Sequence, residues 1–179
     1  MEKQTPPISN LYLIGFMGVG KSYFGRMVSD ALNYQFFDTD HEIENNEGIT
    51  IPEIFNSHGE VYFRKLERDL IESGLPSEAC VIACGGGLAL QEGIMDFLKS
   101  KGVVIALFAS EETIIERTSR NKNRPLLDVD DPREKISQMM AERAPKYLEA
   151  DACIATDGRM VADIMQHLIR SYHSIKKVK

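Results

Sequence analysis

Residues 15–22 (GFMGVGKS) place glycines, a lysine and a serine at a spacing that is typical of phosphate binding. Gly15, Gly20, Lys21 and Ser22 match the pattern G-x-x-x-x-G-K-[S/T], with an apolar run before it and an amphipathic pattern after it. Glycines let the backbone turn its N–H groups toward phosphate oxygens, and the start of the next helix adds partial positive charge. The lysine of such a loop reaches the β- and γ-phosphates, and the serine hydroxyl ligates Mg²⁺. A glycine-rich turn with a surface lysine would not require the flanking strand and helix, so the sequence predicts a nucleoside triphosphate site.

Two aspartates follow the second apolar run, in QFFDTD. Many phosphate-loop proteins hold the metal with an aspartate at the end of a later strand, but here that strand (CVIAC) runs into Gly85, Gly86 and Gly87. The ends of parallel strands meet at the edge where ligands bind in open α/β folds. We therefore expect Asp38 to face the metal and the γ-phosphate, and Asp40 to hold a hydroxyl of the acceptor. The alternative for Asp40 is that it only caps the helix that begins with DHEIENN.

The three consecutive glycines suggest a backbone that comes close to a small ligand and offers N–H groups to it. Arg143 and Glu67 fall on the apolar faces of two expected helices, where a charged group needs a partner. Arg143 lies on the stripe of residues 136–148, and Arg64 precedes Glu67 by three residues, so that carboxylate can orient the guanidinium. Ordinary salt bridges would explain both arginines. Beside a phosphate site, two forked cations also suit a bidentate grip on a carboxylate of the acceptor.

Residues 119–131 (SRNKNRPLLDVDD) have no apolar period, which is typical of a functional lid or of a disordered surface excursion. If the segment is a lid, Arg124 could swing over the γ-phosphate as an arginine finger from the same chain. Arg117 precedes this segment and could stack on the adenine or remain a solvated helix arginine.

The elements that position these residues alternate between β-rich runs and helical patterns, as in a parallel sheet covered on both faces. We expect strands at 11–15, 35–38, 80–84, 103–108 and 152–156. Helical periodicity covers 24–32 and 161–172, and capping signals at Thr50 and Asp131 begin two further helices. The chain is thus expected to form one α/β domain, 1–179, with three layers (α/β/α), a five-stranded parallel sheet and a lid at about 119–131.

Composition excludes several classes of protein. The net charge of −6 argues against a nucleic-acid surface. The apolar run 103–109 is too short to cross a bilayer and the opening residues are polar, so we expect no membrane anchor and no signal peptide. Cys80, Cys84 and Cys153 lie in apolar strand-like segments, which predicts buried, reduced thiols and a cytoplasmic protein. The basic tail 174–179 is expected to fray.

Six motifs occur in one chain in the order GFMGVGKS, FFDTDHEIE, FRKLE, CGGG, NRPLL and RAPKY. With these six motifs the sequence resembles the shikimate kinase family. The resemblance covers nearly all of the chain after the first ten residues. The resemblance implies a P-loop fold of the nucleoside-monophosphate-kinase type and transfer of the γ-phosphoryl group of ATP to the 3-hydroxyl of shikimate. The products would be shikimate 3-phosphate and ADP, in the synthesis of chorismate and aromatic amino acids. It also implies a monomer that uses Mg²⁺.

The resemblance assigns roles to individual residues. The catalytic residues would be Lys21, Asp38 and Arg124. The ATP contacts would be Gly18, Val19, Gly20, Lys21, Ser22, Tyr23, Arg117, Arg124 and, less closely matched, Arg159. The shikimate contacts would be Asp40, Arg64, Gly85, Gly86, Gly87 and Arg143. The ligands of Mg²⁺ would be Ser22 and Asp38.

Two alternative functions remain. A gluconate kinase or another P-loop small-molecule kinase would also phosphorylate a polyol, but the FDTD, GGG and RAPKY set argues against it. A nucleotide-binding regulatory module without transferase activity would be expected to lack Asp38, Arg64 or Arg143, and all three are present.

Overall fold

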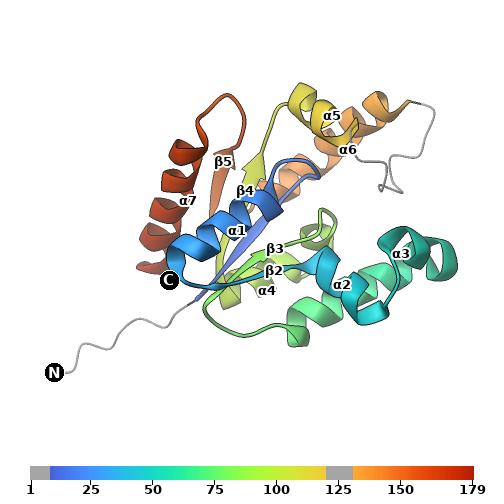
Figure 1. The fold of residues 1–179 in the computed structure, drawn as a ribbon, viewed down its shortest axis with the longest axis horizontal. Helices are drawn as coiled ribbons and strands as arrows, with labels where there is room; N and C mark the ends of the chain where they lie inside the picture. Colours follow the sequence, from blue (N-terminus) through green and yellow to red (C-terminus); the bar gives the residue numbers. More distant parts are fainter. Residues whose placement is uncertain (1–8, 120–130) are drawn as a thin grey trace.

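The computed structural model describes residues 9–119 and 131–179, which form a single twisted sheet between layers of helices (Figure 1). All strand pairs are parallel, and the strand order is β2-β3-β1-β4-β5. The strands are β1 (Asn10–Gly15), β2 (Gln35–Asp38), β3 (Cys80–Ala83), β4 (Gly102–Phe108) and β5 (Ala152–Ala155). Each lies within one residue of the range expected from the sequence, so the predicted five-stranded parallel sheet is confirmed.

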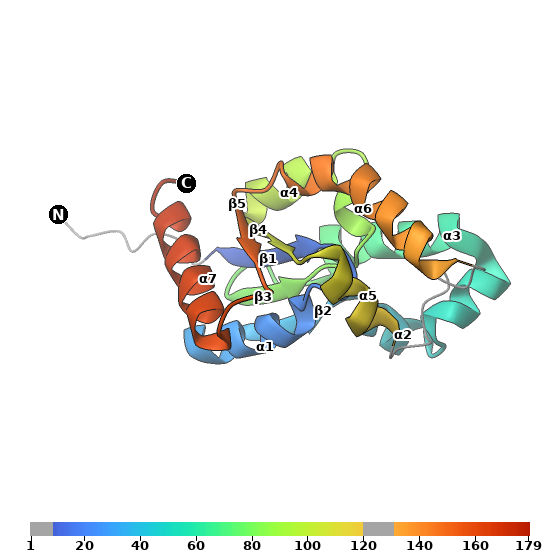
Figure 2. The ribbon, with the colours of Figure 1, turned by 90° about the horizontal axis from the view of Figure 1, so that it is seen from above.

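Helices cover both faces of this sheet. The α-helices are α1 (Lys21–Leu32), α2 (Thr39–Glu47), α3 (Ile51–Asp69), α4 (Ile94–Lys101), α5 (Glu111–Ser119), α6 (Pro132–Tyr147) and α7 (Val161–Lys176). Figure 2 shows α1 on one side of the strands and α4 and α6 on the other. Two short helical turns, η1 (Leu70–Gly74) and η2 (Leu88–Leu90), flank β3 in the chain. The three-layer prediction is thereby confirmed.

The strand β1 is fully buried in the middle of the sheet, and its last residue must be a glycine. Gly15 has a φ of +132°, and a Cβ atom there would lie 2.3 Å from the carbonyl oxygen of Leu107 in β4. Because β1 and β4 approach each other so closely here, the loop that leads into α1 begins at a glycine. The ends of β1, β2 and β3 lie at the same edge of the sheet, because these strands are parallel neighbours.

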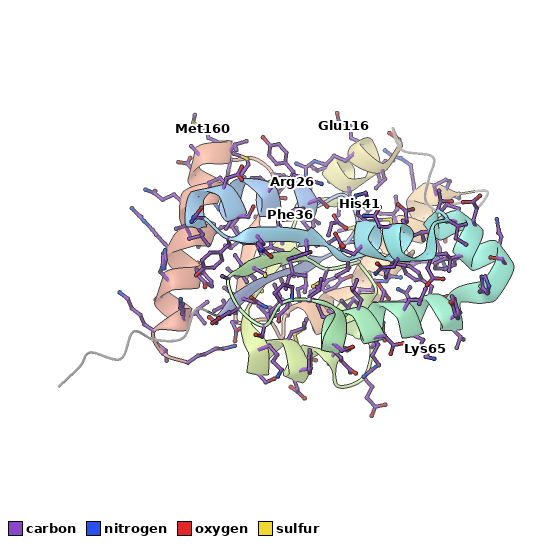
Figure 3. The ribbon with its side chains drawn as sticks, turned by 60° about the horizontal axis from the view of Figure 1, so that its bottom comes forward. Arg26, Phe36, His41, Lys65, Glu116 and Met160 are labelled. Atoms are coloured by element: carbon purple, nitrogen blue, oxygen red, sulfur yellow. The ribbon has the colours of Figure 1, made fainter. Side chains whose placement is uncertain are left out.

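The helix α1 packs closely against β2, which places the glycine loop beside Asp38. A Cβ atom on Gly25 would lie 2.5 Å from Cε2 of Phe36, so the helix can approach the strand only with glycine at this position. The guanidinium of Arg26 lies 4.7 Å from the centre of the Phe36 ring and covers this edge of the sheet (Figure 3).

Local capping begins two helices at the predicted places. The Glu53 carboxylate accepts hydrogen bonds from the Thr50 amide (2.8 Å) and the Thr50 hydroxyl (2.7 Å). Asp131 Oδ1 accepts from the amides of Arg133 and Glu134, both at 3.0 Å. These caps satisfy N–H groups that have no partner inside the helix.

Three expectations about exposure and termini need correction. Cys80 and Cys84 are buried as predicted, but Cys153 is exposed because β5 is an edge strand of the sheet. Leu148, which the periodicity placed on the buried stripe of α6, lies beyond the end of that helix and is exposed. The basic tail does not fray, since α7 continues through Lys176 and the last residue folds back.

The ammonium of Lys179 donates to the carbonyl oxygens of Lys99 (3.0 Å) and Gly102 (2.8 Å) and to Asp151 (2.7 Å). This contact fastens the end of the chain to the start of β4. Among residues 9–119 and 131–179, no helix combines the length and the hydropathy that a bilayer crossing requires. The predicted lid, apart from its end residues Ser119 and Asp131, lies outside the described residues.

Candidate active site

The glycine loop holds its shape through backbone conformations that favour glycine. Gly18 and Gly20 have φ values of +80° and +100°. Four of the loop's carbonyl oxygens accept hydrogen bonds from side chains. The Lys21 ammonium donates to Gly15 (2.8 Å) and Phe16 (2.9 Å).

The other two carbonyl bonds come from distant parts of the chain. The Thr156 hydroxyl, at the end of β5, donates to the carbonyl oxygen of Val19 (2.6 Å). The Arg117 guanidinium on α5 donates to the carbonyl oxygen of Gly18 (3.0 Å). No pattern in the sequence marks Thr156, because its hydroxyl meets the loop only in the folded sheet. Because these four carbonyl oxygens already accept hydrogen bonds from side chains, the loop can present its N–H groups to an anion.

Ser22 and Asp38 lie in direct contact, as expected for two residues that serve one metal. The Ser22 hydroxyl donates to Asp38 Oδ2, and Asp38 Oδ1 accepts from the amide of Asp40 (3.2 Å). Asp38 therefore caps α2, and the alternative that Asp40 caps this helix is wrong. In the described part of the chain no group of three or more His, Cys, Asp or Glu side chains could hold a metal. A hydroxyl and one carboxylate fit Mg²⁺, which keeps several waters and binds substrate phosphates.

Three cavities meet along this edge of the sheet. A central cavity of about 200 Å³ contains Lys21, Ser22 and Asp38 in its walls. It shares Met17, Asp40 and Gly86 with a second cavity of about 420 Å³ between α2, α3, the glycines after β3 and α6. It shares Gly18, Gly20 and Tyr23 with a third cavity of about 650 Å³ beside α5 and α7. A phosphate-sized space thus connects two larger spaces.

The second cavity is lined by both arginines that were predicted to bind the phosphoryl acceptor. Arg64 on α3 and Arg143 on α6 line it together with Asp40. Arg64 donates through Nη1 to Glu67 (2.7 Å), and through Nη2 (2.8 Å) and Nε (3.1 Å) to Glu60. The predicted pairing of Arg64 with Glu67 is confirmed. Salt bridges do hold Arg64, but they hold it at the wall of a cavity.

Glu67 is a fully buried carboxyl group with unequal oxygens. Oε2 accepts from Arg64 and from Gln91 Nε2 (3.0 Å), while Oε1 has no hydrogen-bond partner in the described structure. Burial raises the pKa of Glu67 to about 7, the charge of Asp40 adds to the rise, and Arg64 opposes it. A proton on Glu67 near neutral pH would relieve the repulsion between these two carboxyl groups.

The three glycines make room for charged side chains. A Cβ atom on Gly85 would lie 2.5 Å from both Asp40 Oδ1 and Glu67 Oε1, and one on Gly87 would lie 2.2 Å from Arg64 Nη1. The Gly85 amide donates to the buried Thr39 hydroxyl oxygen (2.8 Å), so it is not offered to a ligand as predicted. Within the described residues the amides of Gly86 and Gly87 donate to no protein acceptor. Thr39 was not among the predicted site residues, because no local pattern distinguishes it.

The third cavity contains three of the residues that were predicted to contact ATP away from the phosphate loop's lysine and serine. Arg117, Arg159 and Tyr23 line it, and Tyr23 is 56% exposed. Arg117 also donates to the carbonyl oxygen of Thr156 (3.4 Å), so its guanidinium lies between the glycine loop and the end of β5. Arg124 lies outside the described residues. Apart from Arg124, the structure brings every predicted site residue to one edge of the sheet.

Comparison with known proteins shows which family this chain resembles. The family model for shikimate kinase matches residues 17–173. A shikimate kinase of Thermodesulfovibrio yellowstonii is 40% identical over 172 residues, which cover 96% of this chain and 99% of that protein. The solved structure of a shikimate kinase from Acinetobacter baumannii in complex with shikimate is similar with a TM-score of 0.89 and 39% identity, over 96% of both chains.

A gluconokinase from Sinorhizobium meliloti has a TM-score of 0.60 and 18% identity, over 96% of this chain and 94% of that one. At that identity the likeness extends to the fold alone, so the gluconate kinase alternative is not favoured. The family match and the 40% identity cover almost the entire chain. The chain therefore belongs to the shikimate kinase family.

Proposed function

We propose that this protein transfers the γ-phosphoryl group of ATP to the 3-hydroxyl of shikimate across the three connected cavities. The observation that supports this most is the wall shared by the central cavity, proposed to hold the phosphates, and the second cavity, proposed to hold the acceptor. This wall contains Asp40 and Gly86. An acceptor hydroxyl held at Asp40 would lie next to a phosphate held by the glycine loop. The oxygen–phosphorus bond forms as the bond between the γ-phosphorus and the ADP oxygen breaks, and the hydroxyl proton leaves.

The phosphate end would use Lys21, Ser22 and Asp38. Lys21 would exchange its two carbonyl bonds for the β- and γ-phosphates. Ser22 and Asp38 would hold Mg²⁺, which neutralises charge on the phosphates. Asp38 also fixes the start of α2 through its cap, so the same carboxylate sets the position of Asp40. Asp38 could also receive the proton of the hydroxyl.

The acceptor end would recognise an anionic alcohol. Asp40 would accept a hydrogen bond from the hydroxyl of the acceptor, and the arginines Arg64 and Arg143 would bind its carboxylate as forked donors. Gly86 and Gly87 would add backbone amides. Gly85 would keep the loop close to the carboxylates. The Glu67 carboxylate would orient Arg64 while remaining out of contact with solvent.

The nucleoside end would lie in the third cavity. Backbone and side-chain contacts to ATP would come from residues 18–23, with Arg117 against the adenine and Arg159 at the cavity wall. Arg124 would serve as the lid arginine. We further propose a single domain over 1–179, a monomer and a cytoplasmic location.

An ADP-release assay tests the proposal, run with shikimate, with gluconate and with no acceptor. We expect turnover that depends on shikimate and that excess EDTA abolishes. Asp40→Ala and Arg143→Ala each remove a charged contact to the acceptor, so kcat/KM for shikimate should fall by about 10- to 150-fold. Equal ADP release without acceptor, or wild-type rates in both variants, would reject the proposal. Faster turnover with gluconate would favour the alternative kinase.

A further inference from the structure

Tyr147 is the last residue of α6 and belongs to the RAPKY motif, of which the proposed function uses only Arg143. Its side chain is 2% exposed. The hydroxyl donates to the carbonyl oxygen of Gly86 at 2.6 Å, across 61 residues of sequence. The ring meets Phe108, at the end of β4, edge to face with 6.4 Å between the ring centres. The hydroxyl is thus held on a rigid platform and directed at the glycine loop after β3.

The accepting carbonyl belongs to a peptide unit in the wall of the acceptor cavity. The planar trans peptide couples the direction of the Gly86 carbonyl to that of the Gly87 N–H, which points the opposite way. Fixing the carbonyl therefore fixes the amide. The Gly87 amide donates to no protein acceptor in the described structure, and Gly87 lies against the Arg64 guanidinium. It is available to an anion that Arg64 binds.

The same bond fixes the end of the helix that carries Arg143. Arg143 and Tyr147 are four residues apart in α6 and so lie on one face of it. The Arg143 guanidinium lies 5.7 Å from the centre of the Phe16 ring in the phosphate loop. The helix end therefore contacts the phosphate loop through Arg143 and the acceptor loop through Tyr147.

A hydrogen bond from a buried tyrosine can also serve stability alone, and the chain offers such a case. Tyr172 on α7 is fully buried, donates to the carbonyl oxygen of Ser9 (2.5 Å) and pairs with the hydroxyl of Tyr34 (3.0 Å). None of these residues lines any of the three cavities. Tyr172 therefore provides a matched reference for a purely structural hydroxyl.

We propose that Tyr147 is a positioning residue for the acceptor: its hydroxyl holds the Gly86–Gly87 peptide and the end of α6 in register, so that the Gly87 amide and Arg143 meet the acceptor carboxylate together. The proposal rests on the proposed function, since it concerns the same anionic acceptor. Tyr147 does not touch the reacting atoms, and it acts through the two groups that bind the carboxylate.

The test compares Tyr147→Phe with Tyr172→Phe, because each change removes one buried hydroxyl and keeps the ring. Both variants are expected to melt at a lower temperature than the wild type. Tyr147→Phe should raise the KM for shikimate by about tenfold. The variant loses one buried hydrogen bond, and this loss weakens both groups that contact the acceptor carboxylate. The KM for ATP should stay within about twofold, and Tyr172→Phe should leave both KM values near those of the wild type.

A second measurement needs no turnover. In ¹⁵N-glycine-labelled protein without ligand, Tyr147→Phe should shift the Gly87 amide resonance, and Tyr172→Phe should leave it in place. If Tyr147→Phe does not fold, shikimate titrated into labelled wild type should shift the Gly87 resonance more than that of Gly85, whose amide is already bonded to Thr39. The proposal would be overturned by any of three results. These are an unmoved Gly87 resonance in the variant, an equal shift of both glycines in the wild type, and a KM of the variant for shikimate within twofold of wild type. Wild type that does not phosphorylate shikimate would instead reject the proposed function, whatever the resonances show.

Discussion

Replacing Glu67 by glutamine should remove a pH dependence that this buried carboxyl imposes on the stability of the fold. Glu67 has no solvent exposure, and only one of its two oxygens accepts hydrogen bonds. Burial, reinforced by Asp40 and opposed by Arg64, raises its pKa from 4.5 to about 7. Glutamine keeps the shape of the side chain and cannot titrate.

The sign follows from the order in which the two states lose the proton. Between pH 4.5 and about 7 the unfolded chain has released the Glu67 proton while the folded protein still holds it. The contribution to stability is therefore fully present below pH 4.5 and is lost as the pH rises through about 7. A shift of about 2.5 pKa units at 1.36 kcal/mol each gives a loss of about 3 kcal/mol in the free energy of unfolding.

Urea unfolding followed by far-ultraviolet circular dichroism would measure this loss, and the chain has no tryptophan to follow by fluorescence. The free energy of unfolding of the wild type minus that of Glu67→Gln should fall by about 3 kcal/mol between pH 4.5 and 8.5. Glu72→Gln is the control, because Glu72 forms an exposed pair with Arg68 (3.0 Å), and it should change stability by less than about 1 kcal/mol at every pH. A wild-type minus Glu67→Gln difference that stays constant over this range would refute the reasoning.

Two further changes test the loops on either side of the site. Gly87→Ala should raise the KM for shikimate by about tenfold or more, because φ at Gly87 is −96° and allows alanine while the new Cβ displaces the Arg64 guanidinium. An unchanged KM would show that Arg64 does not bind the acceptor from this position. Thr156→Val should raise the KM for ATP about threefold to tenfold and leave the KM for shikimate unchanged, because it leaves the Val19 carbonyl without its donor; equal changes in both KM values would show a general loss of structure instead.

Sequence reasoning succeeded where the controlling interactions are local. The glycine loop, the strand that enters it and the helix that leaves it depend on neighbouring residues, and their bounds agree with the structure. The caps at Thr50 and Asp131 are likewise set by residues two or three positions away. The inward position of Glu67 also followed from helical periodicity, because Glu67 lies on the apolar stripe of α3.

The rest depends on contacts between distant segments. Thr39, Thr156 and Tyr147 each hold a backbone group of a loop that lies 46, 137 and 61 residues away in the chain. No spacing within one element can reveal such a bond. The exposure of Cys153 also depends on tertiary structure, because an apolar strand in sequence does not show whether it lies at the centre or the edge of the sheet.

The contacts of the glycine loop divide into two kinds with different consequences for nucleotide binding. The carbonyls of Gly18 and Val19 are bound by side chains of α5 and the end of β5, which need not move when phosphate enters. The carbonyls of Gly15 and Phe16 are bound by Lys21, which would have to leave them to bind the phosphates as proposed. On the proposed function, binding would exchange the partners of one side chain and leave the loop in a shape that other elements already fix. Little of the binding free energy would then be lost to ordering the backbone. That distinction is why the loss of Thr156 should weaken ATP binding rather than abolish it, whereas the loss of Lys21 would remove the charge that binds the transferred group.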